Sequence, residues 1–228
     1  MSGFVLRTTV IAVLLAAACG PEVPRSGQTS GAVATATPGS LDETLAAGAA
    51  MRLEVAPTGN EVRYRVREQL VNLELPNDAI GKTNAVTGGI TLDSAGKVIP
   101  EGSRIVVEVA GLTSDKDRRD GYVRRRVLQA DSFPTVVLAP KEIRGLTWPL
   151  PTSGTRTYDL VGDLTLKGVT RPTTWKVTAN YGPDTVTGTA TTRFTFDDFS
   201  LTQPRVPVVL SVADTIGLEY DFKMAVKK

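Results

Sequence analysis

The sequence has no histidine and only one cysteine. A lone cysteine cannot form an internal disulfide, and a chain without histidine or further cysteines cannot supply the usual ligands of a zinc site. The lack of histidine also removes the most common general base and the side chain that most often titrates near neutral pH. No phosphate-binding loop motif is present either. The sequence therefore predicts no metal site, no cofactor and no enzymatic activity.

A strong excess of charge is also absent, with 26 basic against 24 acidic residues. The basic residues do not gather into one long patch, so charge does not indicate a nucleic-acid partner. The neighbouring acids Asp197 and Asp198 would point to opposite faces of a strand and cannot act as a carboxylate pair. The acids from Asp115 to Asp120 lack the glycine and the closing glutamate of a calcium loop. For Asp120, local salt bridges with nearby arginines are expected instead.

The N-terminus predicts an export signal with a lipid anchor. Residues 1–18 have the pattern of a lipoprotein signal peptide, because Arg7 precedes a short apolar run that ends in small residues. Those residues resemble a bacterial lipobox, although Ala16 stands where leucine is usual, and they make Cys19 the lipidated first residue of the mature chain. The alternative is an ordinary signal peptide followed by an incidental cysteine. Either way, we expect an exported protein of the cell envelope, held to a membrane if Cys19 is acylated.

Residues 19–50 predict a flexible linker that carries the lipidated cysteine. They are rich in Pro, Gly, Ser, Thr and Ala, and they show no sustained apolar period. A helical turn or two could form between Leu41 and Met51, capped by Ser40. The folded domain is expected over residues 51–228, and 41% hydrophobic residues suffice to bury one core.

Alternation of apolar and polar residues indicates an all-β domain. It is clear in residues 103–109 and 135–143, and it is longest in residues 215–226, where a terminal strand could close the sheet on itself. We count about eight strands, a number at which a barrel is either filled by side chains or holds one small ligand. Residues 84–93 suggest a strand with a bulge at Gly88-Gly89, and the segment 76–78 is expected to break the pattern.

The strand expected over residues 61–67 directs Arg63, Arg65 and Arg67 to one face. These arginines could form a patch for anionic lipids, but a solvated outer face of the strand is the favoured interpretation. Residues 112–133 depart from strand patterning. There Tyr122, together with valines 123 and 127, can share one face of a short helix that would cover one open end of a barrel. Trp148 is expected in a loop, either exposed or tucked into the barrel mouth.

The most informative stretch runs from Thr157 to Arg171. Its residues alternate between an apolar and a polar face, and a second alternating run begins at Thr173, so the two predict an antiparallel hairpin. Gly168 and Pro172 are expected to bracket the turn, since glycine accepts a positive φ and proline fixes its own.

This stretch also carries a family resemblance. Residues 162–172, Gly-Asp-Leu-Thr-Leu-Lys-Gly-Val-Thr-Arg-Pro, resemble the signature of the YceI-like family of bacterial envelope proteins. Lys167 stands where that family usually has histidine. Arg119-Asp120 and Phe133-Pro134 resemble further family positions around a short helix. The resemblance implies a lipocalin-like antiparallel β-barrel whose cavity holds a long amphiphile such as a polyisoprenoid.

Two functions fit these patterns. The first is a binding protein whose apolar lumen takes up a polyisoprenoid or other lipid; the second is a structural or stress-response envelope protein with a filled barrel and no ligand. Both need an apolar interior, so alternation alone leaves them open, as it leaves the oligomeric state, with a homodimer as one option. The residues that alternation turns inward are the candidates for the lumen, although each could equally be packed core. These candidates are Tyr64, Val66, Ile105, Val107, Leu164, Leu166, Trp175, Val177, Leu218, Tyr220 and Phe222.

Overall fold

A computed structural model of the chain describes residues 49–228. The predicted signal peptide, Cys19 and nearly all of the predicted linker lie outside these residues. Within the described range, no helix has both the length and the apolar character needed to cross a membrane. The folded domain begins slightly earlier than expected. The segment from Ala49 to Met51 is strand and not the end of a helical turn, because it pairs with the strand that covers residues 86–93.

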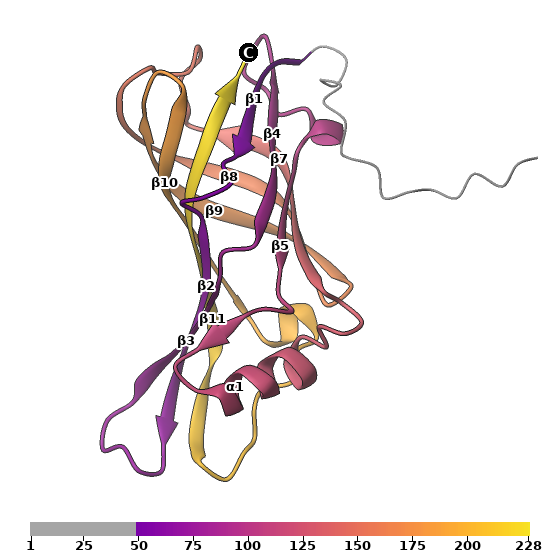
Figure 1. Cartoon of the computed structure of the whole chain (residues 1–228), viewed down its shortest axis with the longest axis vertical. Helices are drawn as coiled ribbons and strands as arrows, with labels where there is room; N and C mark the ends of the chain where they lie inside the picture. The colour runs from indigo at the N-terminus through magenta and orange to yellow at the C-terminus, as the bar shows by residue number, and fades with distance from the viewer. Residues whose placement is uncertain (1–48) are drawn as a thin grey trace, which may run out of the picture. The chain divides into compact units, whose positions relative to one another are not determined.

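The described chain is dominated by antiparallel strands (Figure 1). The strands are β1 (Ala49–Val55), β2 (Glu61–Leu70), β3 (Asn77–Thr83), β4 (Val86–Asp93), β5 (Arg104–Glu108), β6 (Thr113–Ser114), β7 (Thr135–Arg144), β8 (Gly154–Leu166), β9 (Val169–Tyr181), β10 (Thr185–Thr195) and β11 (Val209–Lys227). Between them lie the short helical segments η1 (Pro100–Gly102), α1 (Asp117–Tyr122), η2 (Val123–Val127) and η3 (Asp197–Phe199).

Eight of the strands close into a ring, in the order β1-β4-β5-β7-β8-β9-β10-β11, with β11 returning to β1. This is the eight-stranded, lipocalin-like barrel that the sequence predicted. Closure depends on the length of β11. Its C-terminal part pairs with β1, from Val55 opposite Met224 to Arg52 opposite Lys227. A closed ring leaves none of these strands unpaired along its whole edge.

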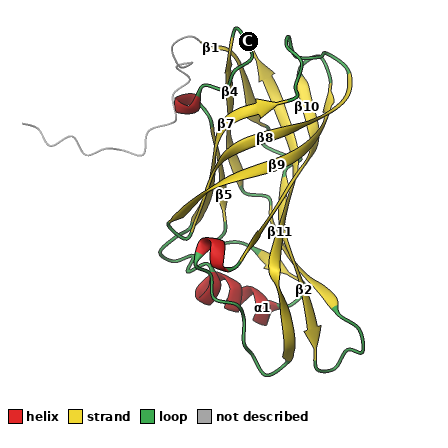
Figure 2. Cartoon of the chain, turned by 180° about the vertical axis from the view of Figure 1, so that it is seen from behind, coloured by secondary structure: helices red, strands yellow, loops and turns green. Residues whose placement is uncertain are grey.

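The N-terminal part of β11 belongs to a second part of the sheet, which the sequence analysis did not distinguish from the barrel. It pairs with β2 from Val209 to Asp221, and β3 and β6 continue outward from β2. As Figures 1 and 2 show, β2, β3 and β11 extend beyond the ring at the end where α1 lies. The expected short helix is therefore present, and it continues directly into the π-helical turn η2.

The predicted hairpin is β8–β9, but its turn is shorter than expected. Lys167 and Gly168 both have positive φ (49° and 75°) and form the turn alone. Pro172 lies within β9, opposite Asp163. Proline is tolerated there because β9 pairs with β10 only over Lys176–Tyr181, so Pro172 has a single neighbouring strand.

Glycines mark close approaches between strands instead of the predicted bulge. β4 pairs with β5 in unbroken register through Gly88 and Gly89. A Cβ on Gly88 would lie 1.9 Å from the carbonyl oxygen of Arg104, and one on Gly89 would lie 2.4 Å from that of Leu53. Both neighbouring strands thus pack too closely for a side chain.

Other local expectations need correction. Strand β2 ends at Leu70, and residues 71–76 form the connection to β3, which starts at Asn77 where a break was expected. The adjacent acids 197 and 198 lie on η3 and not on a strand. Trp148 is half-buried and packs against the hydrophobic core; its ring covers Gly96, and its indole Nε1 donates to the carbonyl oxygen of Ser94 at 2.8 Å.

Candidate ligand-binding cavity

The barrel encloses a cavity of about 940 Å³. Along each strand every second side chain turns inward, and those side chains are almost all aliphatic or aromatic. The interior is therefore apolar but is not filled by its own side chains. The structure places all eleven candidates from the sequence in the cavity lining: Tyr64, Val66, Ile105, Val107, Leu164, Leu166, Trp175, Val177, Leu218, Tyr220 and Phe222. Their contact with a lipid stays a prediction.

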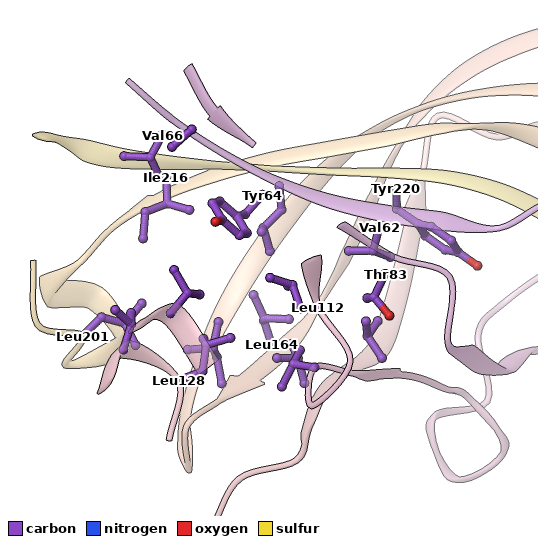
Figure 3. A pocket seen from close by; sticks show the side chains of 18 of the residues that line it. Val62, Tyr64, Val66, Thr83, Leu112, Leu128, Leu164, Leu201, Ile216 and Tyr220 are labelled. Atoms are coloured by element: carbon purple, nitrogen blue, oxygen red, sulfur yellow. The ribbon is translucent and has the colours of Figure 1, made fainter. Parts of the chain in front are cut away.

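The lining also includes residues that the sequence analysis did not select. Several belong to strands whose alternation would have found them, such as Leu53 on β1, Leu138 on β7 and Ala190 on β10. Others lie outside the strands, such as Leu112 and Leu201, and no period in the sequence marks them. Figure 3 shows side chains of both kinds facing the same space.

One end of the cavity carries charge. Lys116, Arg118 and Arg119 contribute to the lining there, together with Glu68 of β2. Arg119 donates from Nη2 to Glu68 Oε1 over 2.6 Å, and it also pairs with Asp115. Burial alone would lower the pKa of Arg119, but these two carboxylates raise it above its ordinary value. The cavity is thus amphiphilic, with a long apolar lumen and a charged mouth.

The salt bridge expected for Asp120 is formed by a neighbouring acid instead. The buried Asp120 carboxylate accepts a hydrogen bond from Ser114 Oγ at 2.6 Å, whereas Asp115 pairs with Arg119 one helical turn away. A hydroxyl partner satisfies Asp120 without bringing a second charge into the interior. Among residues 49–228, no cluster of three or more possible metal-ligating side chains occurs.

One tyrosine hydroxyl in the lumen has no hydrogen-bond partner among residues 49–228. Tyr64 projects from β2 into the cavity, and its buried hydroxyl makes no hydrogen bond with the described residues (Figure 3). Burial raises the pKa of Tyr64 to about 12, so the hydroxyl keeps its proton at neutral pH. Its ring lies over Gly81 on the neighbouring strand, where a Cβ would come within 2.3 Å of the ring carbon Cε1. Tyr220, in contrast, donates its hydroxyl to Asn60 Oδ1 at 2.8 Å.

The three arginines of β2 take no part in the cavity. Arg63 pairs with Glu61, Glu219 and Asp221, and Arg65 pairs with Glu219 and with the acid at position 78. They form a cross-strand ion-pair network on the outer face of the sheet, which agrees with an outer strand face rather than a patch of free cations.

The comparison with known proteins agrees with this architecture. The family model described as the YceI-like domain matches residues 53–224, a range that reaches from β1 to β11. A UPF0312 protein of Pseudomonas putida strain W619 is 35% identical over 126 residues, which cover 51% of this chain and 60% of that protein. The corresponding protein of strain GB-1 is 34% identical with the same coverage. The match thus spans 60% of the length of these relatives.

Solved structures share the fold at low sequence identity. A polyisoprenoid-binding domain from Saccharophagus degradans, implicated in plant cell wall breakdown, has a TM-score of 0.58 at 11% identity and covers 78% of this chain and 99% of its own. BcnA of Burkholderia cenocepacia has a TM-score of 0.53 at 17% identity, over 72% of this chain and 95% of its own. These likenesses establish the fold. The match of the family model over residues 53–224 shows that this chain belongs to the YceI-like domain family.

Proposed function

We propose that the barrel binds a long-chain amphiphile, a polyisoprenoid or another lipid, with its chain in the apolar lumen. The observation that carries the proposal is the cavity itself. Its volume of about 940 Å³ lies at the upper end of the range for small-molecule sites. Each methylene that leaves water for such a lumen contributes about 0.8 kcal/mol. The polyisoprenoid-binding domain of S. degradans, which has the same fold, supports this class of ligand.

The polar groups give the proposed ligand an orientation. The charged mouth with Arg118 would take the head group, while Tyr64 can donate its unpartnered hydroxyl to an oxygen within the lumen. The protein would act as a carrier or store of the lipid and not as a catalyst. With the predicted signal peptide and the predicted acylation of Cys19, we place this role in the cell envelope. A filled barrel without a ligand finds no support in a cavity of this size.

Native mass spectrometry of the chain from Gly20 onward, purified without added lipid, tests the proposal. A discrete added mass that organic solvent extracts as an isoprenoid or acyl chain is the expected result. An unliganded mass, with no uptake of offered isoprenoids or phospholipids, would overturn it.

A matched pair of variants ties the added mass to the lumen. Ala190→Trp places a large ring in the cavity, whereas Thr191→Trp places the same ring on the outer face of β10. We expect the added mass to disappear in the first variant and to persist in the second. Circular dichroism of both variants checks that the barrel has formed.

A further inference from the structure

Exposed apolar side chains gather at one end of the molecule. Among residues 49–228, the large apolar residues that are exposed are Val71 (59%), Leu73 (42%), Leu75 (76%), Val208 (61%) and Leu210 (65%). Val71, Leu73 and Leu75 belong to the β2–β3 connection, whereas Val208 ends the loop that leads into β11 and Leu210 is the second residue of β11. Such residues are normally scattered over the surface of a soluble protein, and a cluster marks an interaction site.

The two regions lie side by side. The backbone N–H of Val71 donates to the carbonyl oxygen of Val208 at 3.1 Å, and Leu70 pairs with Val209 between the strands. Both loops project past α1 at the end where β2, β3 and β11 leave the ring (Figures 1 and 2). We call Val71, Leu73, Leu75, Val208 and Leu210 the apolar tip.

The apolar tip is continuous with the cavity mouth. Val71 and Val208 belong to both, since they also line the cavity. An apolar chain that leaves the lumen at this end therefore meets exposed apolar side chains before it meets water. A rigid protein partner seated on the tip would close this path, whereas the acyl region of a bilayer would extend it.

We propose that the apolar tip inserts into the surface of a lipid bilayer, so that the cavity exchanges its ligand directly with the membrane. This inference rests on the proposed function. The loops carry one acid and one base, Glu74 and Arg205, so insertion is driven by the burial of apolar area and not by attraction to anionic head groups.

The length of chain ahead of β1 permits this orientation. β1 begins at the end of the barrel opposite the apolar tip (Figure 1). The 19 residues of β11, which extend towards the tip, span roughly 60 Å at the rise of a strand. The residues between Cys19 and Ala49 reach about 100 Å when extended. A chain anchored at Cys19 could thus still turn its apolar tip towards the same membrane.

The test is co-sedimentation with phosphatidylcholine vesicles. It uses the chain from Gly20 onward, so that no acyl anchor contributes, and the ring is complete without residues 1–19. We compare the native sequence with the triple variant Leu73→Ser, Leu75→Ser, Leu210→Ser. None of these three leucines lines the cavity, so the variant keeps the lumen intact. Arg205→Ser, in one of the loops, is the matched control.

We expect vesicle affinity to fall by at least about tenfold in the triple variant and to stay within about twofold of the native value in Arg205→Ser. Affinity should persist at about 0.5 M salt, where the Debye length is only a few ångströms. A single variant, Leu73→Trp, should show a blue shift of tryptophan emission on addition of vesicles.

Three results of the vesicle experiments would overturn the proposal. They are a lack of vesicle binding by the native sequence, equal binding by the triple variant, and binding that needs phosphatidylglycerol and disappears with salt. Analytical ultracentrifugation of the native sequence and the triple variant detects a dimer that uses the tip instead, which would also overturn it. Native mass spectrometry of the triple variant separates a failure of the membrane proposal from a failure of the proposed lipid binding. Lipid bound in the lumen should remain in this variant, whether or not the variant binds vesicles.

Discussion

Arg119 on α1 donates a hydrogen bond to Glu68 on β2 over 2.6 Å and so joins two segments that lie 51 residues apart in the sequence. The pair is largely enclosed, with side-chain exposures of 15% and 8%. It stands at the charged mouth of the cavity and holds the helix against the barrel wall.

We therefore predict that Arg119→Gln destabilises the fold by about 2–3 kcal/mol, because it leaves the Glu68 carboxylate buried without its cationic partner. The matched control is Arg118→Gln on the same helix, which removes an exposed guanidinium and should change stability by less than about 0.5 kcal/mol. Urea unfolding at neutral pH measures the free energy of unfolding of both variants. Equal losses in the two variants would show that the ion pair does not hold the helix.

The double variant Glu68→Gln, Arg119→Gln isolates the pair. Because it removes the unpaired charge as well, it should be more stable than Arg119→Gln alone. A loss equal to the sum of the two single variants would mean that the two side chains act independently.

A second prediction concerns Gly162, the first residue of the family motif. A Cβ on Gly162 would lie 2.6 Å from the backbone oxygen of Ala139 on β7, beside the register shift near Pro140. We expect Gly162→Ala to force the two strands apart and to cost about 2 kcal/mol or more. At Gly217 the nearest backbone atom is 3.7 Å from the added carbon, so Gly217→Ala should be neutral or slightly stabilising. Thermal unfolding measures the stability of both variants. A comparable loss of stability in the two would contradict the predicted clash at Gly162.

The sequence could predict the parts of this molecule that repeat with period two. Alternation placed all eleven lumen candidates in the cavity lining, because a strand that is half-buried must segregate its side chains by face. Closure of the ring could also be predicted, because the alternating run of residues that ends near Val226 is longer than a single neighbouring strand would pair with. The family motif led to the proposed class of ligand, which alternation alone could not indicate.

Other features depend on contacts between segments that are distant in the sequence. Nothing local indicates that β11 divides between β1 and β2, or that Leu112 and Leu201 meet inside the barrel. Pro172 is expected to bracket the turn because proline fixes its own φ, yet it is tolerated within β9, where it has a single neighbouring strand. Likewise, two glycines that suggested a bulge mark a close approach of strands.

A third prediction contrasts two tyrosines of the lumen. Tyr64 has a buried hydroxyl without a partner, whereas the Tyr220 hydroxyl donates to Asn60. In the ligand-free protein, Tyr64→Phe should leave stability unchanged or raise it by up to about 1 kcal/mol, because no hydrogen bond is lost. Tyr220→Phe should cost about 1–2 kcal/mol, because Asn60 loses a buried donor. Urea unfolding of delipidated protein compares them, and a substantial loss for Tyr64→Phe would show that its hydroxyl already has a partner.

The last prediction follows from the ion pairs on the outer face of β2 and β11. The hydrogen bond from Arg65 holds the pKa of Glu219 below its ordinary value, and Arg63 adds to the effect. The folded state therefore binds a proton at this carboxylate more weakly than the unfolded state does. The resulting stability is present above about pH 5 and is lost as the pH falls through the folded pKa.

Because the sequence has no histidine, we expect the unfolding free energy to be nearly constant between about pH 5 and 8 and to decline below that range. Glu219→Gln should remove about 1 kcal/mol at neutral pH, a modest value because the pair is partly exposed, and should flatten the decline towards pH 3. The exposed Glu101→Gln is the control and should leave both the plateau and the slope unchanged. Urea unfolding at a series of pH values measures the difference. An acid slope that is the same in Glu219→Gln as in the native sequence would show that this carboxylate does not contribute to acid stability.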